Sequence, residues 1–522
     1  MTGRWLPLAL MICGCAATAA GSPEVETAEH YYSVETIPAP DGVVPECGGL
    51  GFLPDGRLVA VFDHGEVCFY DPAQRHWSTF AEGLHSPLGV LPISGREVLV
   101  CQRAELTRLI DSRGTGKADI YECVSDRWGI SGNYHEFAYG PVRDARGNLY
   151  VALGMASPDG VTRYEVRGRT NSSEYNYGRK SMYSSVPYRG WVAKIAPDGT
   201  FTPVADGFRQ PNGIVLDPEG RLFVTDNQGD WVGTSKLFCV VPGAFYGHPG
   251  SLSWEPDWGG PLSALELDKK RHEGNVLFPH AILANSPGQP VIDTTGGKFG
   301  PFAGQMFVTE FNTPRVLRVM LETVHGELQG ATTPFYDGPP LRTGNIRLAF
   351  APDGSLWVGQ TERPKGWPAA AGIQRIAWKG QTPMDVLGLH LTATGFEFTF
   401  TKPVDPASAM RAEAYSGRRY YYLYRAGYGS PRIDVHDVRV GRVSVSPDGR
   451  RVGFDVDALK AGYIYEFTLR GIRAADGTPL INGLIAYTAN RLQDGASRPI
   501  PRPAPTGEIR GRGSDQPPDS SL

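Results

Sequence analysis

The chain has 522 residues, of which 41% are hydrophobic and 20% are charged, and its formal net charge is −4 at pH 7. Together with 65 glycines and 43 prolines, this composition is typical of a loop-rich globular β protein. A charge so close to neutral, without a long basic run, argues against nucleic acid as a partner. No stretch after the N-terminal segment reaches the ~18 apolar residues that a transmembrane helix needs.

Residues 1–20 have the features of an export signal. One positive charge at Arg4 precedes a short apolar run at 5–12, and small residues follow at 16–20. Residues 12–15 also resemble a bacterial lipobox in which Cys15 would carry the lipid, although Cys at the second position departs from the usual Ala or Ser. We expect an exported protein, periplasmic or extracellular. Either it is released as a soluble protein or a lipid anchor alone holds it at the membrane.

Between residues 31 and 380 one structural unit recurs, a turn glycine followed by a short run of apolar, β-prone residues. The turn glycines are Gly56, Gly95, Gly147, Gly220, Gly304 and Gly354. Their uneven spacing of about 40 to 80 residues suits four-stranded blades with loop insertions. The sequence therefore predicts an all-β fold with a six-bladed β-propeller over 31–380. A strand at 31–38 would close the ring by pairing with the last blade. An irregular β-sandwich with unrelated glycine turns is the alternative.

The pattern changes after residue 380. Short strands separated by polar turns over 383–490 predict an immunoglobulin-like β-sandwich. The segment 497–522 is rich in Pro, Gly, Arg and Ser, which predicts a disordered tail. Five cysteines lie outside the export signal, and this odd number fixes no disulfide pairing.

Polar clusters at 132–140, 208–213 and 342–347 precede the first strands of blades three, four and six. Equivalent positions in successive blades surround the same axial mouth, so distant residues converge there. The predicted ring consists of His135, Arg209, Asn212, Gln228 and Arg347. Two insertions, at 158–190 and 248–290, either roof this mouth or decorate the surface.

Over about residues 40–380 the chain resembles the pyrroloquinoline quinone (PQQ)-dependent glucose and sorbosone dehydrogenase superfamily. Within it, the chain is most similar to a branch of exported bacterial proteins described as membrane-bound dehydrogenases. The resemblance is clearest at 104–109, 132–136, 209–213, 226–231 and 245–248. It implies a dehydrogenase that oxidises a sugar or another small alcohol and passes the electrons to an acceptor protein.

The resemblance also implies roles for the site residues. His135 corresponds to the base that takes the proton from the substrate hydroxyl, and Arg209 to the arginine that polarises a quinone carbonyl. The residues implied to contact PQQ are Arg209, Gln210, Asn212, Gln228 and Arg347, and those implied to hold calcium are Gln228, Gly229, Asp230 and Tyr246.

Two departures from the family pattern stand out. Asp230 stands alone where paired acids are expected, although calcium prefers several oxygen ligands, and no lysine matches the one that binds the quinone. The structural alternatives are that Arg209 and Arg347 tie blades together, that Asn212 is a turn residue, and that Asp226 and Asp230 cap turns. The competing function is a non-catalytic propeller that binds a glycan or a protein partner through the same mouth.

Overall fold

The computed structural model describes residues 26–160, 166–171, 181–362 and 370–500. The predicted export signal with Cys15 lies outside the described residues, as do residues 501–522 of the predicted 497–522 tail. Within the described part of that tail, Ser497 forms a bridge with Arg491, and Arg498 forms an ion pair with Asp268. Among the residues that the structure describes, no helix has the length and apolar character needed to cross a membrane. The five cysteines in this part of the chain are all free thiols.

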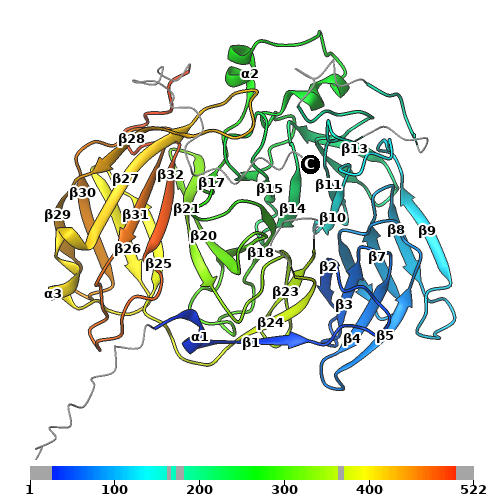
Figure 1. Ribbon diagram of the computed structural model, residues 1–522, viewed down its shortest axis with the longest axis horizontal. Helices are drawn as coiled ribbons and strands as arrows, with labels where there is room; N and C mark the ends of the chain where they lie inside the picture. Colours follow the sequence, from blue (N-terminus) through cyan, green and yellow to red (C-terminus); the bar gives the residue numbers. More distant parts are fainter. Residues whose placement is uncertain (1–25, 161–165, 172–180, 363–369, 501–522) are drawn as a thin grey trace, which may run out of the picture.

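The first part of the chain forms successive sheets of four antiparallel strands (Figure 1). The first three are β2 (Cys47–Phe52), β3 (Leu58–Phe62), β4 (Val67–Asp71) and β5 (His76–Ala81); β6 (Val90–Ser94), β7 (Glu97–Cys101), β8 (Leu106–Ile110) and β9 (Ile120–Ser125); and β10 (Ala138–Arg143), β11 (Leu149–Leu153), β12 (Trp191–Ile195) and β13 (Phe201–Asp206). The next three are β14 (Pro211–Leu216), β15 (Leu222–Asp226), β16 (Lys236–Cys239) and β17 (Val276–Leu277); β18 (Pro287–Ile292), β19 (Met306–Glu310), β20 (Arg315–Val324) and β21 (Glu327–Asp337); and β22 (Asn345–Phe350), β23 (Leu356–Gln360), β24 (Gly372–Trp378) and β1 (Tyr32–Ile37).

Each predicted turn glycine lies between the first and second strand of its sheet. At Gly56 the backbone has a φ of 91°, in the left-handed region that favours glycine, and its N–H donates to the carbonyl of Leu53 to close the turn. The second strands, such as β3 and β15, are buried along their whole length. The sequence of β3 is apolar throughout, because its two faces pack in two different hydrophobic clusters.

The sheets follow one another in a closed ring. The first strand of each sheet contacts the first strands of its two neighbours, in the order β2, β6, β10, β14, β18 and β22, and β22 returns to β2. The N-terminal strand β1 pairs with β24 from Tyr32 opposite Trp378 to Ile37 opposite Ile373, as predicted for ring closure. This arrangement is consistent with the blades of a β-propeller.

The C-terminal unit is joined to the ring by a continuous sheet. Its strands are β25 (Val386–Leu391), β26 (Gly395–Phe400), β27 (Tyr415–Tyr422), β28 (Arg432–Val438), β29 (Val440–Val445), β30 (Arg451–Val456), β31 (Tyr463–Leu469) and β32 (Leu484–Ala489). One sheet has the order β25-β26-β30-β29, whereas β32, β31, β27 and β28 extend the β18–β21 sheet to eight strands through the pairing of β21 with β32. The two sheets share one hydrophobic core. The immunoglobulin-like assignment stays a prediction.

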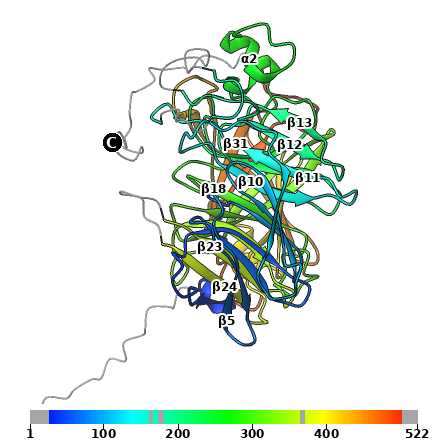
Figure 2. The same cartoon turned by 90° about the vertical axis from the view of Figure 1, so that its right-hand side faces the viewer.

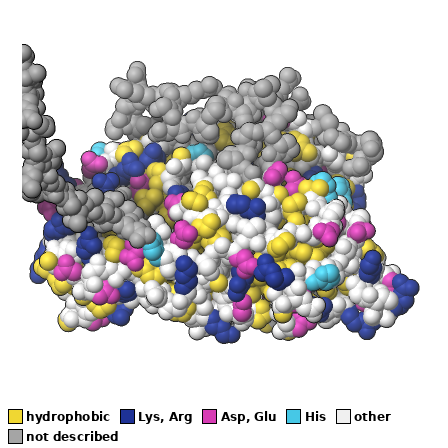
Figure 3. Space-filling view, turned by 60° about the horizontal axis from the view of Figure 1, so that its bottom comes forward, with side chains coloured by type: hydrophobic (Ala, Val, Ile, Leu, Met, Phe, Trp, Pro, Cys, Tyr) yellow, Lys and Arg dark blue, Asp and Glu magenta, His cyan; other side chains and the backbone are white. Residues whose placement is uncertain are grey.

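The helices are short. They are α1 (Ala28–Tyr31), α2 (Ala264–Lys270), α3 (Pro406–Ala409) and the 3-10 turns Pro249–Trp254 and Ala412–Ala414. In the side view α2 lies at one end of the molecule, beyond β12 and β13 (Figure 2). On the face shown in Figure 3, charged side chains of both signs are interspersed with hydrophobic ones, as the small net charge leads one to expect.

Candidate functional site

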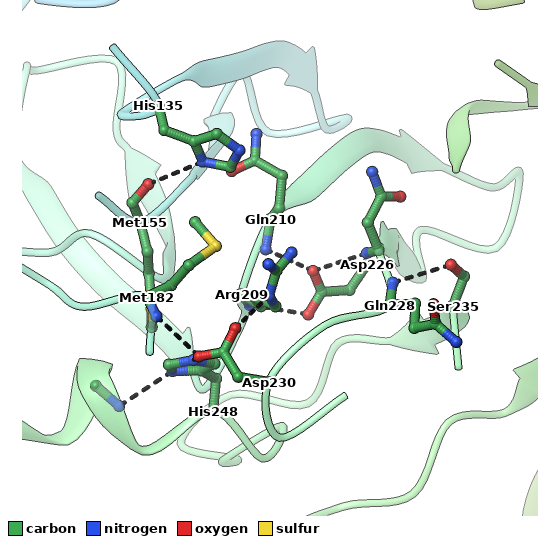
Figure 4. A network of polar contacts seen from close by, with 12 residues as sticks. His135, Met155, Met182, Arg209, Gln210, Asp226, Gln228, Asp230, Ser235 and His248 are labelled. Atoms are coloured by element: carbon green, nitrogen blue, oxygen red, sulfur yellow. Dashed lines mark hydrogen bonds and ion pairs between the residues drawn. The ribbon is translucent and has the colours of Figure 1, made fainter. Parts of the chain in front are cut away.

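A network of polar contacts lies where the chain enters β14 and leaves β15 (Figure 4). Asp226, the last residue of β15, is fully buried and accepts the backbone N–H groups of Arg209 at 2.9 Å, Gln210 at 2.6 Å and Asn227 at 3.0 Å. Burial raises the pKa of Asp226, and these hydrogen bonds oppose the rise. Asp226 therefore ties the loop before β14 to the loop after β15, which is the capping role left open above.

A second carboxylate, Asp230, binds the side chains of Arg209 and His248 and one backbone group. Its Oδ1 accepts from Nε of Arg209 at 2.8 Å, and its Oδ2 accepts from Nε2 of His248 and from the N–H of Met182, each at 2.8 Å. His248 is fully buried, and its Nδ1 accepts from the N–H of Gly250 at 3.2 Å. Since a backbone N–H can only donate, the proton of the neutral His248 ring is on Nε2, facing Asp230.

The electrostatics of this cluster favour a charged Asp230. Burial alone would raise the pKa of Asp230, but its interactions with His248 and Arg209, including a hydrogen bond from each, outweigh the effect of burial and hold the pKa well below its usual range. Burial would likewise lower the pKa of Arg209, and the charge of Asp230 raises it instead. Arg209 and Asp230 thus form a buried ion pair at neutral pH.

The guanidinium of Arg209 is held in place through Nε, and its two terminal nitrogens are not used in that contact. It packs directly on Gly229, where a Cβ atom would lie 1.9 Å from Nε. Within the described residues its terminal nitrogens make no hydrogen bond, and the ring of Tyr428 lies 5.3 Å from Cζ. In Figure 4 these nitrogens point away from Asp230, toward the side where Gln210 and His135 lie. Arg209 can therefore donate to a ligand at this mouth.

His135 lies at the same mouth, on the loop before β10. Its Nδ1 is 3.3 Å from the carbonyl oxygen of Met155, whose own N–H donates to the carbonyl of Arg209 at 3.2 Å. A carbonyl only accepts, so Nδ1 carries the proton and Nε2 is the basic nitrogen of the neutral ring. The exposed ring of Tyr134 packs edge-on against the imidazole, with centroids 5.6 Å apart. His135 can therefore act as a proton acceptor through Nε2.

Arg347 and Asn212 lie instead on the axis of the ring. Arg347 is buried and donates to the carbonyls of Gly48 at 2.6 Å and Asn212 at 2.9 Å, with its guanidinium 5.1 Å from the ring centroid of Tyr139. The cavity that these side chains line has a volume of about 30 Å³, room for one or two water molecules and too little for a sugar or a quinone. Arg347 thus ties the inner strands together.

Gln210 connects these two groups, since its Nε2 donates to the hydroxyl of Tyr139 at 2.7 Å. Gln228 faces away from both, because its backbone N–H donates to Oγ of Ser235 at 3.0 Å and its Nε2 to the carbonyl of Gly233 at 3.3 Å. The structure therefore brings together His135, Arg209 and Gln210 at the mouth. Asn212 and Arg347 form a separate axial group.

The residues predicted to hold calcium do not form a calcium site. The Tyr246 hydroxyl is in the core, where it donates to the carbonyl of Cys239 at 2.8 Å, and the Gly229 carbonyl accepts from the N–H of Gly429. The two oxygens of Asp230 already accept from three protein donors. Within the described ranges, no three His, Cys, Asp or Glu side chains are grouped as metal ligands. The arrangement does not fit PQQ held through calcium in the predicted way.

Two residues of the cluster were missed as site residues. His248 was noted only within the segment 245–248, and nothing local pairs it with Asp230. Tyr428 comes from the C-terminal unit, far along the chain. Its only sequence signal is an aromatic residue between Gly427 and Gly429, in a loop that was assigned to another domain.

No protein-family model matches the sequence, and no curated protein matches it. Among solved structures, the PQQ-bound aldose sugar dehydrogenase of Streptomyces coelicolor is 17% identical, with 67% of this chain and 98% of that chain covered and a TM-score of 0.45. The apo-form soluble aldose sugar dehydrogenase of Escherichia coli is 14% identical, with 66% and 99% covered and a TM-score of 0.46. A luciferin-regenerating enzyme is 13% identical, with 67% and 98% covered and a TM-score of 0.39. The expected resemblance to sugar dehydrogenases is thus found as a structural match at low identity, and it assigns no activity to this chain.

Proposed function

We propose that the protein binds a sugar or another alcohol with several hydroxyl groups at the mouth formed by Arg209 and His135. The observation that carries this is the way Arg209 is held. Asp230 takes only Nε of the guanidinium, so the terminal nitrogens are donors for a ligand. A fixed cation that is already neutralised favours hydroxyl or carbonyl oxygens over a full anion. The features of residues 1–20 support the further proposal that the protein acts outside the cytoplasm.

Oxidation of the bound alcohol is the second candidate function. One observation favours it: Nδ1 of His135 faces the carbonyl of Met155, so Nε2 is the nitrogen that can take a hydroxyl proton. Oxidation also needs a hydride acceptor, and PQQ would supply that chemistry if it were bound. The residues implied to hold it do not fit it, so we derive no step through the quinone. Binding of a glycan without catalysis would need no cofactor.

The first experiment is equilibrium binding of the purified protein to a panel of aldoses, polyols and oligosaccharides by isothermal titration calorimetry. Saturable binding of at least one of them is expected, and no binding across the panel would refute the proposal. The same panel is then tested with PQQ, calcium and an artificial electron-accepting dye. Turnover that falls at least about 100-fold in His135→Ala, with binding retained, would establish oxidation. Binding without turnover would leave the non-catalytic function.

A further inference from the structure

The loop between β27 and β28, residues 423–431, is paired in detail with the loop after β15. Tyr428 and Asp230 form an antiparallel bridge, and the N–H of Gly429 donates to the carbonyl of Gly229 at 2.9 Å. The N–H of Trp231 donates to the carbonyl of Arg425 at 3.0 Å. The N–H of Ser430 donates to the carbonyl of Gly233 at 2.9 Å. The C-terminal unit therefore adds a strand-like segment to the edge of the candidate site.

This pairing depends on close backbone approach at two glycines. A Cβ atom on Gly233 would lie 2.7 Å from the carbonyl oxygen of Leu423. Gly429 has a φ of 59°, and a Cβ there would lie 3.0 Å from Cδ of Gln228. At Gly233 a larger residue would press on the backbone of the other loop, and at Gly429 the left-handed φ favours glycine, so the sequence on both sides is adapted to this contact.

Tyr424 anchors the start of the same loop. Its hydroxyl donates to the carbonyl of Gly247, next to His248, and its ring packs on Trp231 with centroids 5.1 Å apart. The guanidinium of Arg271 also lies over the ring, with Cζ 4.5 Å from its centroid. The loop is thus fixed at its start and along its length, and Tyr428 is positioned by it.

Tyr428 differs from the residues that hold the loop. Its side chain is 61% exposed, the largest value among the large hydrophobic side chains that the structure describes as exposed. The guanidinium of Arg209 lies over one face of the ring, with Cζ 5.3 Å from the ring centroid, so the opposite face is the one left for a ligand. Tyr134, which is 53% exposed, packs against His135. Two exposed aromatic side chains, one from the ring of sheets and one from the C-terminal unit, thus flank the polar groups of the mouth.

We propose that the C-terminal unit is part of the binding site and that Tyr428 is the wall on which the ring of a bound sugar stacks. This rests on the proposed function. A pyranose ring presents C–H groups on its faces and hydroxyls on its rim. An aromatic face attracts such C–H groups, while a neighbouring guanidinium donates to the hydroxyls. Tyr428 beside Arg209 supplies both, so cyclic sugars are the substrate class that this geometry selects over open-chain polyols.

The test uses the full protein and the sugars found to bind it. Tyr428→Ala is expected to weaken the binding of a cyclic sugar roughly 10-fold, since one aromatic contact is removed. Tyr428→Phe is expected to stay within about twofold, because the stacking face is kept. Tyr121→Ala, at another exposed tyrosine, on β9, is the matched control and should leave binding unchanged.

The shape of the ligand distinguishes stacking on Tyr428 from a purely structural role of this residue. Stacking requires a ring, so Tyr428→Ala should affect an open-chain polyol much less than the cyclic sugar, whereas a displaced loop would weaken both equally. If Tyr428→Ala binds the cyclic sugar and the open-chain polyol as tightly as the wild-type protein does, this inference is overturned and the proposed function stands. Equal weakening of both ligands would also overturn it. Failure of the wild-type protein to bind any sugar would instead refute the proposed function.

Discussion

Asp230 is the residue whose replacement tests the candidate site most directly. Asp230→Asn keeps the shape of the side chain but replaces one acceptor oxygen by an NH₂ group. Arg209 donates to one oxygen, and His248 and the Met182 N–H donate to the other. Whichever way the amide is turned, at least one buried donor faces the NH₂ group, and the buried Arg209 charge loses its counter-ion. We expect the free energy of unfolding to fall by roughly 2–4 kcal/mol.

The assay is urea unfolding followed by tryptophan fluorescence, which Trp231 reports from the same loop. The matched control is Asp353→Asn, since Asp353 pairs with Arg375 at 2.9 Å but is 55% exposed, and its loss should cost at most about 1 kcal/mol. A loss in Asp230→Asn no larger than in this control would refute the reasoning.

The pH dependence of the same variant gives an independent check. The pKa of Asp230 is lowered in the folded state, so its contribution is fully present above the unfolded value near 4 and is lost as the pH falls toward the lowered folded pKa. The stability difference between wild-type protein and Asp230→Asn should therefore be constant from pH 5 to 7 and shrink below about pH 4. A difference that grows on acidification would contradict the assignment of a charged Asp230.

Two further predictions concern neighbouring residues. Gly229→Ala places a Cβ atom against the Arg209 guanidinium, so it should cost about 1–3 kcal/mol and weaken sugar binding in the same titration. Gly259→Ala, where a Cβ meets no atom within 4 Å and φ is not in the left-handed region, should leave binding intact. Burial raises the pKa of Asp206 to about 7, although a hydrogen bond from Ser251 opposes the rise. The folded state therefore holds this proton more tightly than the unfolded state, and stability falls as the pH rises from about 4 through 7. In Asp206→Asn, the decrease in the free energy of unfolding between pH 5 and pH 8 should be smaller than in the wild-type protein by on the order of 3 kcal/mol. The measurement is the urea midpoint at the two pH values, which should drop less in the variant. An unchanged pH profile would contradict the prediction.

Much of the fold could be predicted because its signals are local. A turn glycine such as Gly56 and the apolar run that follows it belong to one hairpin, and a hairpin is formed by neighbours in the sequence. The pairing of β1 with β24 also followed from the sequence, since a ring of sheets leaves one edge to be closed. The extension of the β18–β21 sheet by β32 did not, because an edge strand carries no sequence mark of its partner.

The site was predictable only as a set of residues. The polar clusters before β10 and β14 contained His135, Arg209 and Gln210, which the fold does bring together, because strand ends of neighbouring sheets lie at one mouth. The roles of Asp230 and Tyr246 could not be read from spacing. Whether a carboxylate holds a metal or an arginine depends on which side chains face it, and that is settled by loops from other parts of the chain.

The sequence by itself thus determined the repeated hairpins, since each depends on contacts between near neighbours, and their repetition indicated the ring and the residues available at its mouth. Only the tertiary structure decided that Asp230 pairs with Arg209 and His248, that Arg347 fills the axis, and that Tyr428 of the C-terminal unit stands beside Arg209. These contacts join segments that are distant in the chain. Their geometry arises from the packing of whole sheets, for which no short stretch of sequence carries a signal.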